Sequence, residues 1–473
     1  MKFTQHLLKK EEGYYETRLP WKPDHPALPK NKVLATARLW STTKRLEIIG
    51  KLKDYNEVMQ EQIQEGIIEK IPQRPSGESV HYIPHQAVIR EDAESTKLRI
   101  VYDCSAKPNP QLPSINDSLE TGPALQPLLF DIILRNRMKN YCITGDIKKA
   151  FLQIRIAEQD RDAQRILWYD NLKDRNIIEY RFTRVIFEAG PSPYILGATL
   201  QKHVLNYKRS YPGTVNALLK DTYVDDIQYG GDSLEELVRF KEQATKIMKE
   251  GRFTLHKWHS NIASLESTAA EKGRQKEEDD IREQMNQHEE LRNTSKILGI
   301  QWDKYKDLLQ INFESCHQTN QPVTKRKMLA VINSIFDLLG WVSPVTITAK
   351  ILFSELCLRK VTSDESLPED IQRRWNLWIK GLKLCPTITI PRSVKSPREE
   401  KLSVHGFADA SKQAVCAAVY LLVTYPNGTV DKNLLVAKSR ISPRDLSIPR
   451  LELVAAHTLA KLIKSCYGNT ELV

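Results

Sequence analysis

The sequence lacks the paired cysteines that zinc sites and thiol redox motifs require. Its seven cysteines stand singly along the chain, and no two of them have a C-x-x-C spacing. An odd, dispersed set is typical of reduced thiols rather than of a disulfide framework. The sequence therefore argues against a zinc knuckle, a thiol redox enzyme and a disulfide-rich secreted protein.

Long apolar runs are absent as well. No stretch approaches the roughly 18 consecutive apolar residues that a membrane-spanning helix needs. The N-terminal segment MKFTQHLLKKEEGYYE has no apolar core of a signal peptide. We therefore expect no signal peptide, no transmembrane segment, no membrane partner and a cytoplasmic location.

Acidic residues are fewer than basic ones, so the chain of 473 residues has a formal net charge of +11. Such an excess of positive charge favours a polyanionic partner, although many basic proteins share it without sharing a function. The chain is longer than one hydrophobic core supports, so we expect two to four domains.

The order of the predicted elements indicates an α+β domain in the middle of the chain. Helical spacing predicts a helix between residues 41 and 71, and Pro127 is placed to begin another that runs to about Met138. The remaining expected elements are two strands at 81–103, a strand that ends near Asp146, a strand at 177–187, a helix at 193–208, two strands around an acidic turn at 217–230 and a helix at 233–250 with Ser233 as its N-cap. This order suits a helix packed on one face of an antiparallel sheet.

Three acidic residues in this region have the arrangement that a magnesium site needs. Asp146 ends an apolar strand, and Asp225 and Asp226 follow Tyr223 and Val224. Leu218 and Leu219 before the pair, and Ile227 and Tyr229 after it, predict that the pair forms the turn of a β-hairpin. Two divalent cations about 3.5–4 Å apart can clamp a transferring phosphoryl group, and Mg²⁺ prefers carboxylate oxygens. The alternative is that Asp-Asp is an ordinary turn dipeptide, which the pair taken alone favours.

The flanking residues carry a resemblance to reverse transcriptases. Tyr-Val-Asp-Asp in a hairpin resembles their signature, and Asp146 in TGDIKKAFLQI matches their first catalytic aspartate. The resemblance implies that Phe151 is the aromatic gate against a ribose 2′-hydroxyl. It implies that Arg99, and less directly Lys97, in KLRIVYDCSA hold the incoming triphosphate, and that Lys257 in GRFTLHKWHSN approaches it. KILGIQWD is expected to form one strand and resembles the primer-grip region. Without the resemblance, Phe151 reads as a core aromatic and the cations as surface residues.

Further blocks narrow the resemblance to the Pao/BEL class of long-terminal-repeat retrotransposons, over roughly residues 10–470. They include YETRLPWKPDHPALPKN, SINDSLETGP, QRILWYD and RKMLAVINSIFDLLGWVSPVTITAKILFSEL. The resemblance implies an RNA-directed DNA polymerase with two Mg²⁺ ions, acting with an RNA template, a DNA primer, an RNA–DNA hybrid and deoxynucleoside triphosphates. The nucleus and a retroelement particle are then alternatives to the cytoplasm. A nucleotide cyclase or another palm-fold enzyme would not explain the blocks outside the three acids.

One block departs from the family pattern. The family usually has Phe-Gly-x-x-Ser-Ser-Pro where this chain has Phe187-Glu188-Ala189-Gly190-Pro191-Ser192-Pro193. Glu188 adds bulk and negative charge where a glycine lets the backbone approach a polyanion, and Pro191 removes an amide donor. The alternative function is therefore an inactive, truncated retroelement remnant that at most binds nucleic acid.

The C-terminal segment resembles the first half of ribonuclease H. HGFADASKQAVCAAVYL places Asp409 at the end of a strand, and IPRLELVAAHTLAKLI places Glu452 on the helix that follows. The resemblance implies that these two acids are metal ligands, whereas alone they read as a turn residue and an exposed helix acid. That active site uses four acids in the family, so we expect an incomplete domain, weak metal binding and no ribonuclease H activity. No Asp-Thr-Gly or Asp-Ser-Gly protease motif occurs in the chain.

The expected fold class is a multidomain α+β protein with a right-hand polymerase followed by a truncated ribonuclease H-like α/β domain. The expected domains are an extended N-terminal strap at 1–40, fingers and the start of the palm at 41–140, the palm at 141–260, a charged insertion at 261–295, thumb and connection at 296–400 and the incomplete ribonuclease H-like domain at 401–473.

Overall fold

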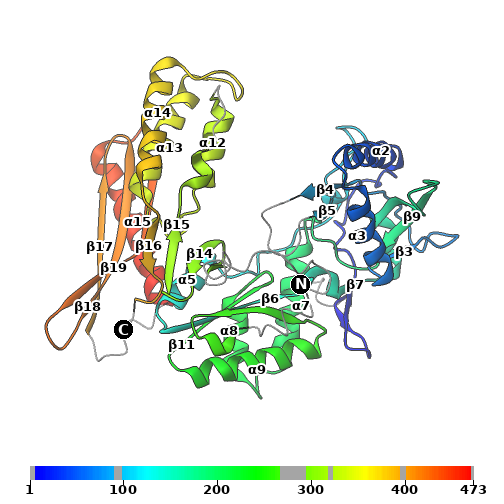
Figure 1. Ribbon diagram of the computed structural model, residues 1–473, viewed down its shortest axis with the longest axis horizontal. Coiled ribbons are helices and arrows are strands. Elements are labelled where there is room, and N and C mark those ends of the chain that lie inside the picture. Colours follow the sequence, from blue (N-terminus) through cyan, green and yellow to red (C-terminus); the bar gives the residue numbers. More distant parts are fainter. Residues whose placement is uncertain (1–5, 90–97, 267–293, 318–322, 395–400, 470–473) are drawn as a thin grey trace. The chain divides into compact units, whose positions relative to one another are not determined.

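The computed structural model forms two compact units (Figure 1). It describes residues 6–89, 98–266, 294–317, 323–394 and 401–469. The first unit comprises residues 1–126, 147–219 and 243–255, and the second comprises residues 127–146, 220–242 and 256–473. Residues 267–293 of the charged insertion predicted at 261–295 lie outside the described residues.

The first unit combines helices with small sheets. Its elements are β1 (Leu8–Lys9), β2 (Tyr15–Thr17), α2 (Lys32–Ile48), α3 (Leu52–Gln64), β3 (Ile68–Lys70), β4 (His85–Ile89), β5 (Leu98–Tyr102), α4 (Ile115–Ser118), η1 (Ala150–Gln153), β7 (Ile154–Ile156), α6 (Glu158–Arg161), η2 (Asp162–Gln164), β8 (Arg165–Tyr169), β9 (Ile177–Phe182) and α7 (Ser192–Leu205). Its sheets have the strand orders β1-β2-β7, β3-β9-β8 and β4-β5. Strand β8, RILWY, is buried at every position, so it forms the centre of the core.

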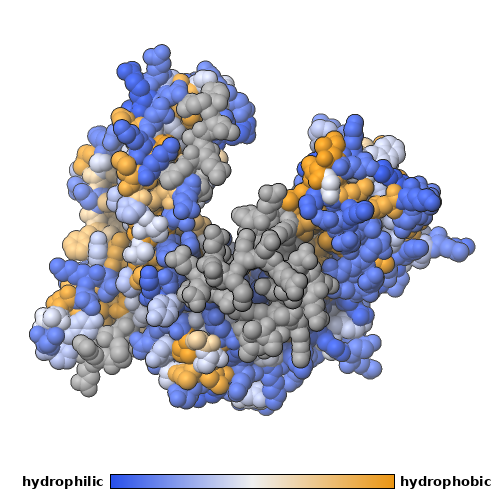
Figure 2. Space-filling view, viewed as in Figure 1, coloured by the Kyte–Doolittle hydropathy of each residue, from blue (hydrophilic) through white to orange (hydrophobic). Residues whose placement is uncertain are grey.

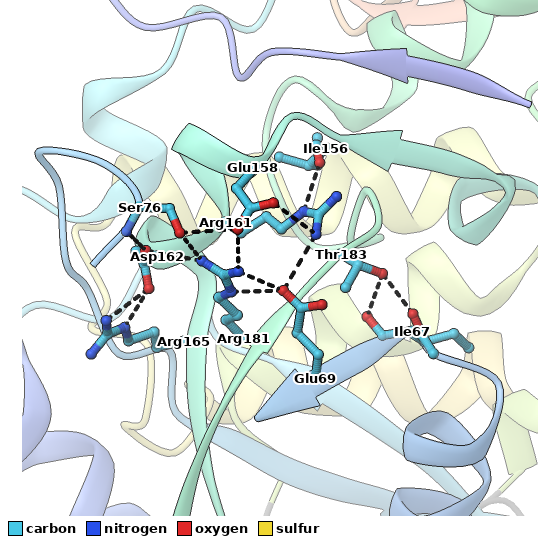
Figure 3. A network of polar contacts seen from close by, with 11 residues as sticks. Ile67, Glu69, Ser76, Ile156, Glu158, Arg161, Asp162, Arg165, Arg181 and Thr183 are labelled. Atoms are coloured by element: carbon cyan, nitrogen blue, oxygen red, sulfur yellow. Dashed lines mark hydrogen bonds and ion pairs between the residues drawn. The ribbon is translucent and has the colours of Figure 1, made fainter. Parts of the chain in front are cut away.

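A buried network of charges ties the sheet β3-β9-β8 to the loop before β4 (Figure 3). Arg181 on β9 donates to Asp162 at 3.1 Å, to Glu69 at 2.7 Å and to Glu158 at 2.8 Å. Arg165 on β8 donates to Asp162 at 2.8 Å, and Asp162 also accepts from the backbone N–H of Ser76. Because Asp162 is wholly buried, these partners are what make its charge tolerable.

The second unit begins with the sheet that carries the predicted acids. Its strand order is β10-β11-β6-β12, with β6 at Tyr141–Ile147, β10 at Thr222–Tyr223, β11 at Asp226–Gly231 and β12 at Leu255–Ser260. Helix α5 (Leu129–Arg137) packs against β11, and α8 (Pro212–Asp221) and α9 (Leu234–Glu250) have residues in both units. The apolar residues of α9 recur every three or four positions, and this spacing places Leu237, Phe240, Ala244 and Ile247 on its buried face.

The middle of the second unit is a four-stranded meander with a helical layer. Its elements are η3 (Ala263–Leu265), β13 (Thr294–Ile297), β14 (Ile300–Asp303), β15 (Leu308–Ile311), η4 (Glu314–His317), α12 (Lys325–Ser334), α13 (Ser343–Leu358), α14 (Glu369–Leu384) and β16 (Ile388–Pro391). The strands pair in the order β13-β14-β15-β16. Trp375, Leu356 and Met328 form a common core among the three helices.

The end of the second unit is a three-stranded antiparallel sheet with one helix. Strands β17 (Lys401–Ala410), β18 (Ala414–Thr424) and β19 (Val430–Ile441) pair in that order, and α15 (Ile448–Asn469) packs on β17 and β18. Alternate residues of β18 are buried from Val415 to Val423, so one face of this almost wholly apolar strand packs against the core. Gly406 on β17 allows the close approach of α15, because a Cβ there would lie 2.8 Å from both Leu459 and Ile463.

Several predicted elements are confirmed, and others need correction. The helix expected at 193–208 is α7, and the helix expected at 233–250 is α9, whose Glu236 N–H donates to Ser233 at 3.2 Å. The single helix expected between 41 and 71 is instead two, α2 and α3, because Gly50 takes a left-handed φ of 67° between them.

Two further expectations were wrong in detail. Leu218 and Leu219 belong to helix α8, not to a strand, so the first strand of the acidic hairpin is only Thr222–Tyr223. KILGIQWD is a hairpin rather than one strand, because Leu298 and Gly299 both have positive φ and reverse the chain between β13 and β14.

The face seen in Figure 2 is mostly hydrophilic, with apolar patches on both units. The described residues contain no helix that is both long and apolar enough to cross a bilayer.

Candidate active site

The acidic hairpin places Asp226 at the first position of β11. Tyr223 on β10 is its register partner, and Val224 and Asp225 form the turn between the two strands. Val224 has a φ of 58°, which is unusual for a β-branched residue and stores strain on the order of 1–3 kcal/mol. Such strain is concentrated at functional sites, so the turn is a feature to be explained by function rather than by stability.

Strand pairing brings Asp146 opposite the hairpin. Strands β11 and β6 are antiparallel, and Asp226 and Asp146 are direct register partners. The side chains of such partners extend from the same face of the sheet. The preceding residue, Gly145, is needed for packing, since a Cβ there would lie 2.8 Å from the ring of Trp258. The sequence GD therefore sets the carboxylate at a defined place beside the hairpin.

Strand β12 adds two basic side chains. His256 Nε2 lies 2.9 Å from Asp146 Oδ2, and Lys257 Nζ lies 4.0 Å from the same oxygen. Consecutive strand residues normally point to opposite faces, but Lys257 has a φ of 52°, which interrupts the alternation. The sequence predicts Lys257 here, whereas His256 was missed. In the sequence, the one indication that His256 belongs to the site is its position directly before Lys257.

Burial and the neighbouring carboxylates raise the pKa of Asp226. Desolvation by the surrounding protein, followed by the charges of Asp225 and Asp146, raises the pKa of Asp226 to about 7, and Lys257 opposes the rise. The side chain of Asp226 nevertheless remains open to solvent. A group of acids whose charges disfavour each other and that can be reached from outside is suited to binding cations.

A metal ion at this place would need ligands from outside the protein. In the described part of the chain, no three His, Cys, Asp or Glu side chains are close enough together to hold a metal ion by themselves. Mg²⁺ is commonly bound through one or two carboxylates, with water and substrate phosphates completing its octahedron. The pair Asp146 and Asp226, with Asp225 beside it, fits that mode of binding.

The other predicted nucleotide-binding residues belong to the first unit. Phe151 lies in η1 and is 5% exposed, with its ring edge-to-face against Phe187 at 5.1 Å between centroids. Arg99 is exposed on β5, opposite Val88 on β4. Lys97 lies outside the described residues.

The unusual block before α7 is well packed. Asn116 accepts from the Gly190 N–H at 2.8 Å, and Ser192 Oγ donates to the Ile186 carbonyl at 2.5 Å. Pro191 precedes the first residue of α7, where a missing N–H costs no helical hydrogen bond. Burial, and then the charge of Asp103, raises the pKa of Glu188. The local fold therefore accommodates both Glu188 and Pro191. If these residues have an unfavourable effect, we expect it in the binding of a polyanion.

The two predicted ribonuclease H acids lie on neighbouring elements. Asp409 is exposed near the end of β17, and Glu452 is exposed near the start of α15. Ala410 and Leu451, which follow and precede them, belong to one apolar cluster, so both acids lie at the same end of this sheet and helix.

Comparison with protein-family models gives a match over residues 324–472, to the Pao retrotransposon-like RNaseH-like domain. Residues 324–472 are thus similar to a Pao retrotransposon-like domain. The resemblance to Pao-type elements is confirmed for these residues. The matched residues include helices α12, α13 and α14 as well as the terminal sheet.

Solved structures extend the likeness in fold to nearly the whole chain. The foamy viral protease-reverse transcriptase dRH in complex with double-stranded DNA matches with a TM-score of 0.54 at 15% identity, over 96% of this chain and 63% of that one. The same foamy viral enzyme in complex with an RNA/DNA hybrid matches with a TM-score of 0.52 at 15% identity, over 95% and 48%. The foamy viral protease-reverse transcriptase in complex with double-stranded DNA matches with a TM-score of 0.53 at 15% identity, over 88% of this chain and 72% of that one.

The matches to solved structures show a reverse transcriptase-like fold, and residues 324–472 within it are similar to the Pao retrotransposon-like RNaseH-like domain. The chain spans 63% and 48% of the length of the first two foamy viral chains. No curated protein is significantly similar to it in sequence.

Proposed function

We propose that the chain is an RNA-directed DNA polymerase of a retroelement. The observation that carries the proposal is the register pairing of Asp146 with Asp226, beside Asp225 in a strained turn. The similarity to retroelement proteins supports a role in nucleic-acid processing, and the three carboxylates narrow that role to metal-assisted nucleotidyl transfer.

In this mechanism, the 3′-hydroxyl oxygen of a DNA primer attacks the α-phosphorus of a deoxynucleoside triphosphate. A new P–O bond forms, the bond to the bridging oxygen of pyrophosphate breaks, and the hydroxyl proton passes to solvent water. Asp146, Asp225 and Asp226 would hold two Mg²⁺ ions, which when bound lower the pKa of the hydroxyl and neutralise the leaving group.

The remaining residues bind and orient the substrates. The Nε2–H of His256 donates to Asp146 Oδ2 and limits the rotation of that carboxylate. Lys257, 4.0 Å from Asp146, supplies positive charge for the triphosphate, as do Arg99 and Lys97 in this proposal. Phe151 excludes nucleotides with a 2′-hydroxyl. RNA template, DNA primer and their hybrid are the expected nucleic-acid partners.

The rival function is an inactive remnant that binds nucleic acid without copying it. Glu188 favours it, because a carboxylate at that position opposes a bound polyanion. In the part of the chain that the structure describes, no third His, Cys, Asp or Glu lies close enough to Asp409 and Glu452 to form a metal site with them. Two acids alone should bind Mg²⁺ weakly, so we propose that this chain does not cleave RNA.

Primer extension on an RNA template separates the two functions. The wild-type chain, with Mg²⁺ and deoxynucleotides, should extend a labelled DNA primer, and Asp146→Asn should slow extension by roughly 1,000-fold, because several kcal/mol of charge stabilisation are lost. Gel-shift binding of the same primer–template by both chains is the control. Binding without extension by the wild type would favour the remnant.

A further inference from the structure

Two arginines of the first unit face each other across neighbouring strands. Arg155 on β7 and Arg184 form an antiparallel bridge. The Val185 N–H donates to the Ile154 carbonyl at 3.0 Å, and the Ile156 N–H donates to the Thr183 carbonyl at 2.9 Å. These bonds lie on either side of the two arginines, whose own backbones do not bond to each other. Arg155 and Arg184 are therefore a non-hydrogen-bonded pair, the type of antiparallel pair whose Cα atoms are closest, at about 4.5 Å.

Neither guanidinium group has an anionic partner within the described part of the chain. The Nε atoms of both arginines are sealed from solvent and lack a hydrogen-bond partner there. Like charges directly opposite on a sheet destabilise it, and a buried donor left unsatisfied costs further free energy. The protein alone gives no compensation for this arrangement.

The surrounding carboxylates are already paired with other cations. Glu16, in register with Arg155 on β2, binds Lys10 at 2.8 Å. Glu65 binds Lys149 at 2.9 Å. Arg161, the other nearby cation, is engaged with Glu69 and with the Ile156 carbonyl (Figure 3). Among the described residues, no carboxylate forms an ion pair with either member of the bridged pair, and the charge of Glu65 offsets that of Arg184 only in part.

Tyr14 fixes the orientation of one of the two groups. The guanidinium carbon of Arg155 lies 3.6 Å from the centroid of the Tyr14 ring. Stacking occupies the face of a guanidinium and leaves its in-plane N–H donors available. Both side chains are only partly buried, so an anion can reach them from solvent.

We propose that Arg155 and Arg184 form a binding site for a phosphate group, with Tyr14 as its supporting wall. Two arginine forks match the several oxygens and the charge of a phosphate, whereas one carboxylate would leave donors unmet. The pKa of Arg184 is lowered by burial, and then by the charges of Arg155 and Arg161, as expected for cations that lack an anion. The site is separate from the three aspartates and does not depend on polymerase activity. Free phosphate and a nucleic-acid phosphodiester are the two possible sources.

Thermal unfolding at constant ionic strength tests the site. Inorganic phosphate, in exchange for chloride, should raise the Tm of the wild-type chain in a saturable way. Arg184→Gln should raise the Tm in phosphate-free buffer, because it removes the repulsion, and should weaken phosphate binding by roughly tenfold or more. Arg155→Gln should behave in the same way, and Arg209→Gln, at an exposed arginine, should match the wild type in both buffers.

Competition identifies the source of the phosphate. If the site binds nucleic acid, a single-stranded oligonucleotide should displace phosphate, and Arg184→Gln should lower the salt dependence of oligonucleotide binding by about one phosphate contact. Free phosphate would be assigned as the ligand by either of two results. The first is no displacement of phosphate by the oligonucleotide, and the second is displacement with an unchanged salt dependence of oligonucleotide binding in Arg184→Gln. The proposal is overturned if the wild type has no saturable response to either ligand, or if Arg184→Gln lowers the Tm in phosphate-free buffer and keeps the phosphate response.

Discussion

Asp226 combines a proposed functional role with a cost in stability. Its pKa in the folded chain is about 7, because of desolvation and the charges of Asp225 and Asp146, against an ordinary value of 3.8. The folded state therefore binds more protons than the unfolded state between these two values. The resulting loss of stability is absent below the ordinary pKa, grows as the pH rises, and is complete above about 7.

Replacing this carboxylate should stabilise the folded chain at high pH. In the absence of divalent cations, Asp226→Asn should be more stable than the wild type by about 1 kcal/mol near pH 8, a value reduced for solvent screening of an open side chain. The difference should shrink toward pH 5. Urea denaturation of both chains across this range measures it, and a difference independent of pH would contradict the assigned shift.

Phe151 offers a test of substrate selection. It packs edge-to-face on Phe187, so a smaller residue leaves room where a 2′-hydroxyl would lie in the proposed complex. Phe151→Val should lower the preference for deoxynucleotides over ribonucleotides by roughly 10–100-fold. Single-nucleotide incorporation measures this ratio, with Phe336→Val at an exposed phenylalanine as the control. An unchanged ratio would remove Phe151 from the nucleotide site.

The sequence predicts the residues that carry a motif and misses those that do not. Asp146, Asp225 and Asp226 could be proposed because an acid at a strand end and an acidic hairpin turn fit a phosphoryl-transfer site, and Lys257 because its block resembles a reverse transcriptase motif. His256 could not, since its contact with Asp146 depends on the lateral pairing of β12 with β6. The Arg155–Arg184 pair could not be found either, because the bridge joins residues distant in the chain.

At the scale of elements, the glycine before Asp146 controls how β6 meets β12. Gly145→Ala would place a Cβ 2.8 Å from the buried ring of Trp258, so a strand must shift. We expect a loss of about 1–3 kcal/mol in the free energy of unfolding, together with slower primer extension.

Helix α8 offers the matched control, because a Cβ at Gly213 has no neighbour within 4 Å. Gly213→Ala should leave both quantities nearly unchanged. Equal effects of the two substitutions, measured by urea denaturation and extension rate, would show that Trp258 does not restrain the strand.

The buried charge network offers a second test at this scale. Arg181→Leu removes a 4% exposed side chain that is bonded to Asp162 and Glu69, and it leaves buried negative charge without full compensation (Figure 3). We expect a loss of about 3–5 kcal/mol in the free energy of unfolding. Arg209→Leu, at an exposed position, should change it by about 0.5 kcal/mol or less. A small effect at Arg181 would mean that water reaches the network.

Periodicity predicts long elements better than short ones. Helices α7 and α9 follow their patterns, since one face of each is buried. Leu218 and Leu219 show the limit: two leucines before an acidic turn suit a strand or a helix equally. The structure assigns them to α8 and leaves β10 only two residues long.

At the scale of the whole molecule, the chain keeps a reverse transcriptase-like fold at 15% identity to the foamy viral structures. Binary patterning of apolar residues can conserve such a fold while most side chains change. The blocks shared with Pao-type elements made this predictable, and the match over residues 324–472 confirms that part.

The central claim is that Asp146, Asp225 and Asp226 together hold a pair of divalent cations in the complex with nucleic acid and nucleotide. Mn²⁺ has the same preference for oxygen ligands as Mg²⁺ and is detected by electron paramagnetic resonance. The measurement is the number of Mn²⁺ ions bound per complex of the protein with primer–template and a non-hydrolysable deoxynucleotide. The account predicts two ions for the wild-type chain and one or none for Asp226→Asn. An equal number for both chains would contradict it.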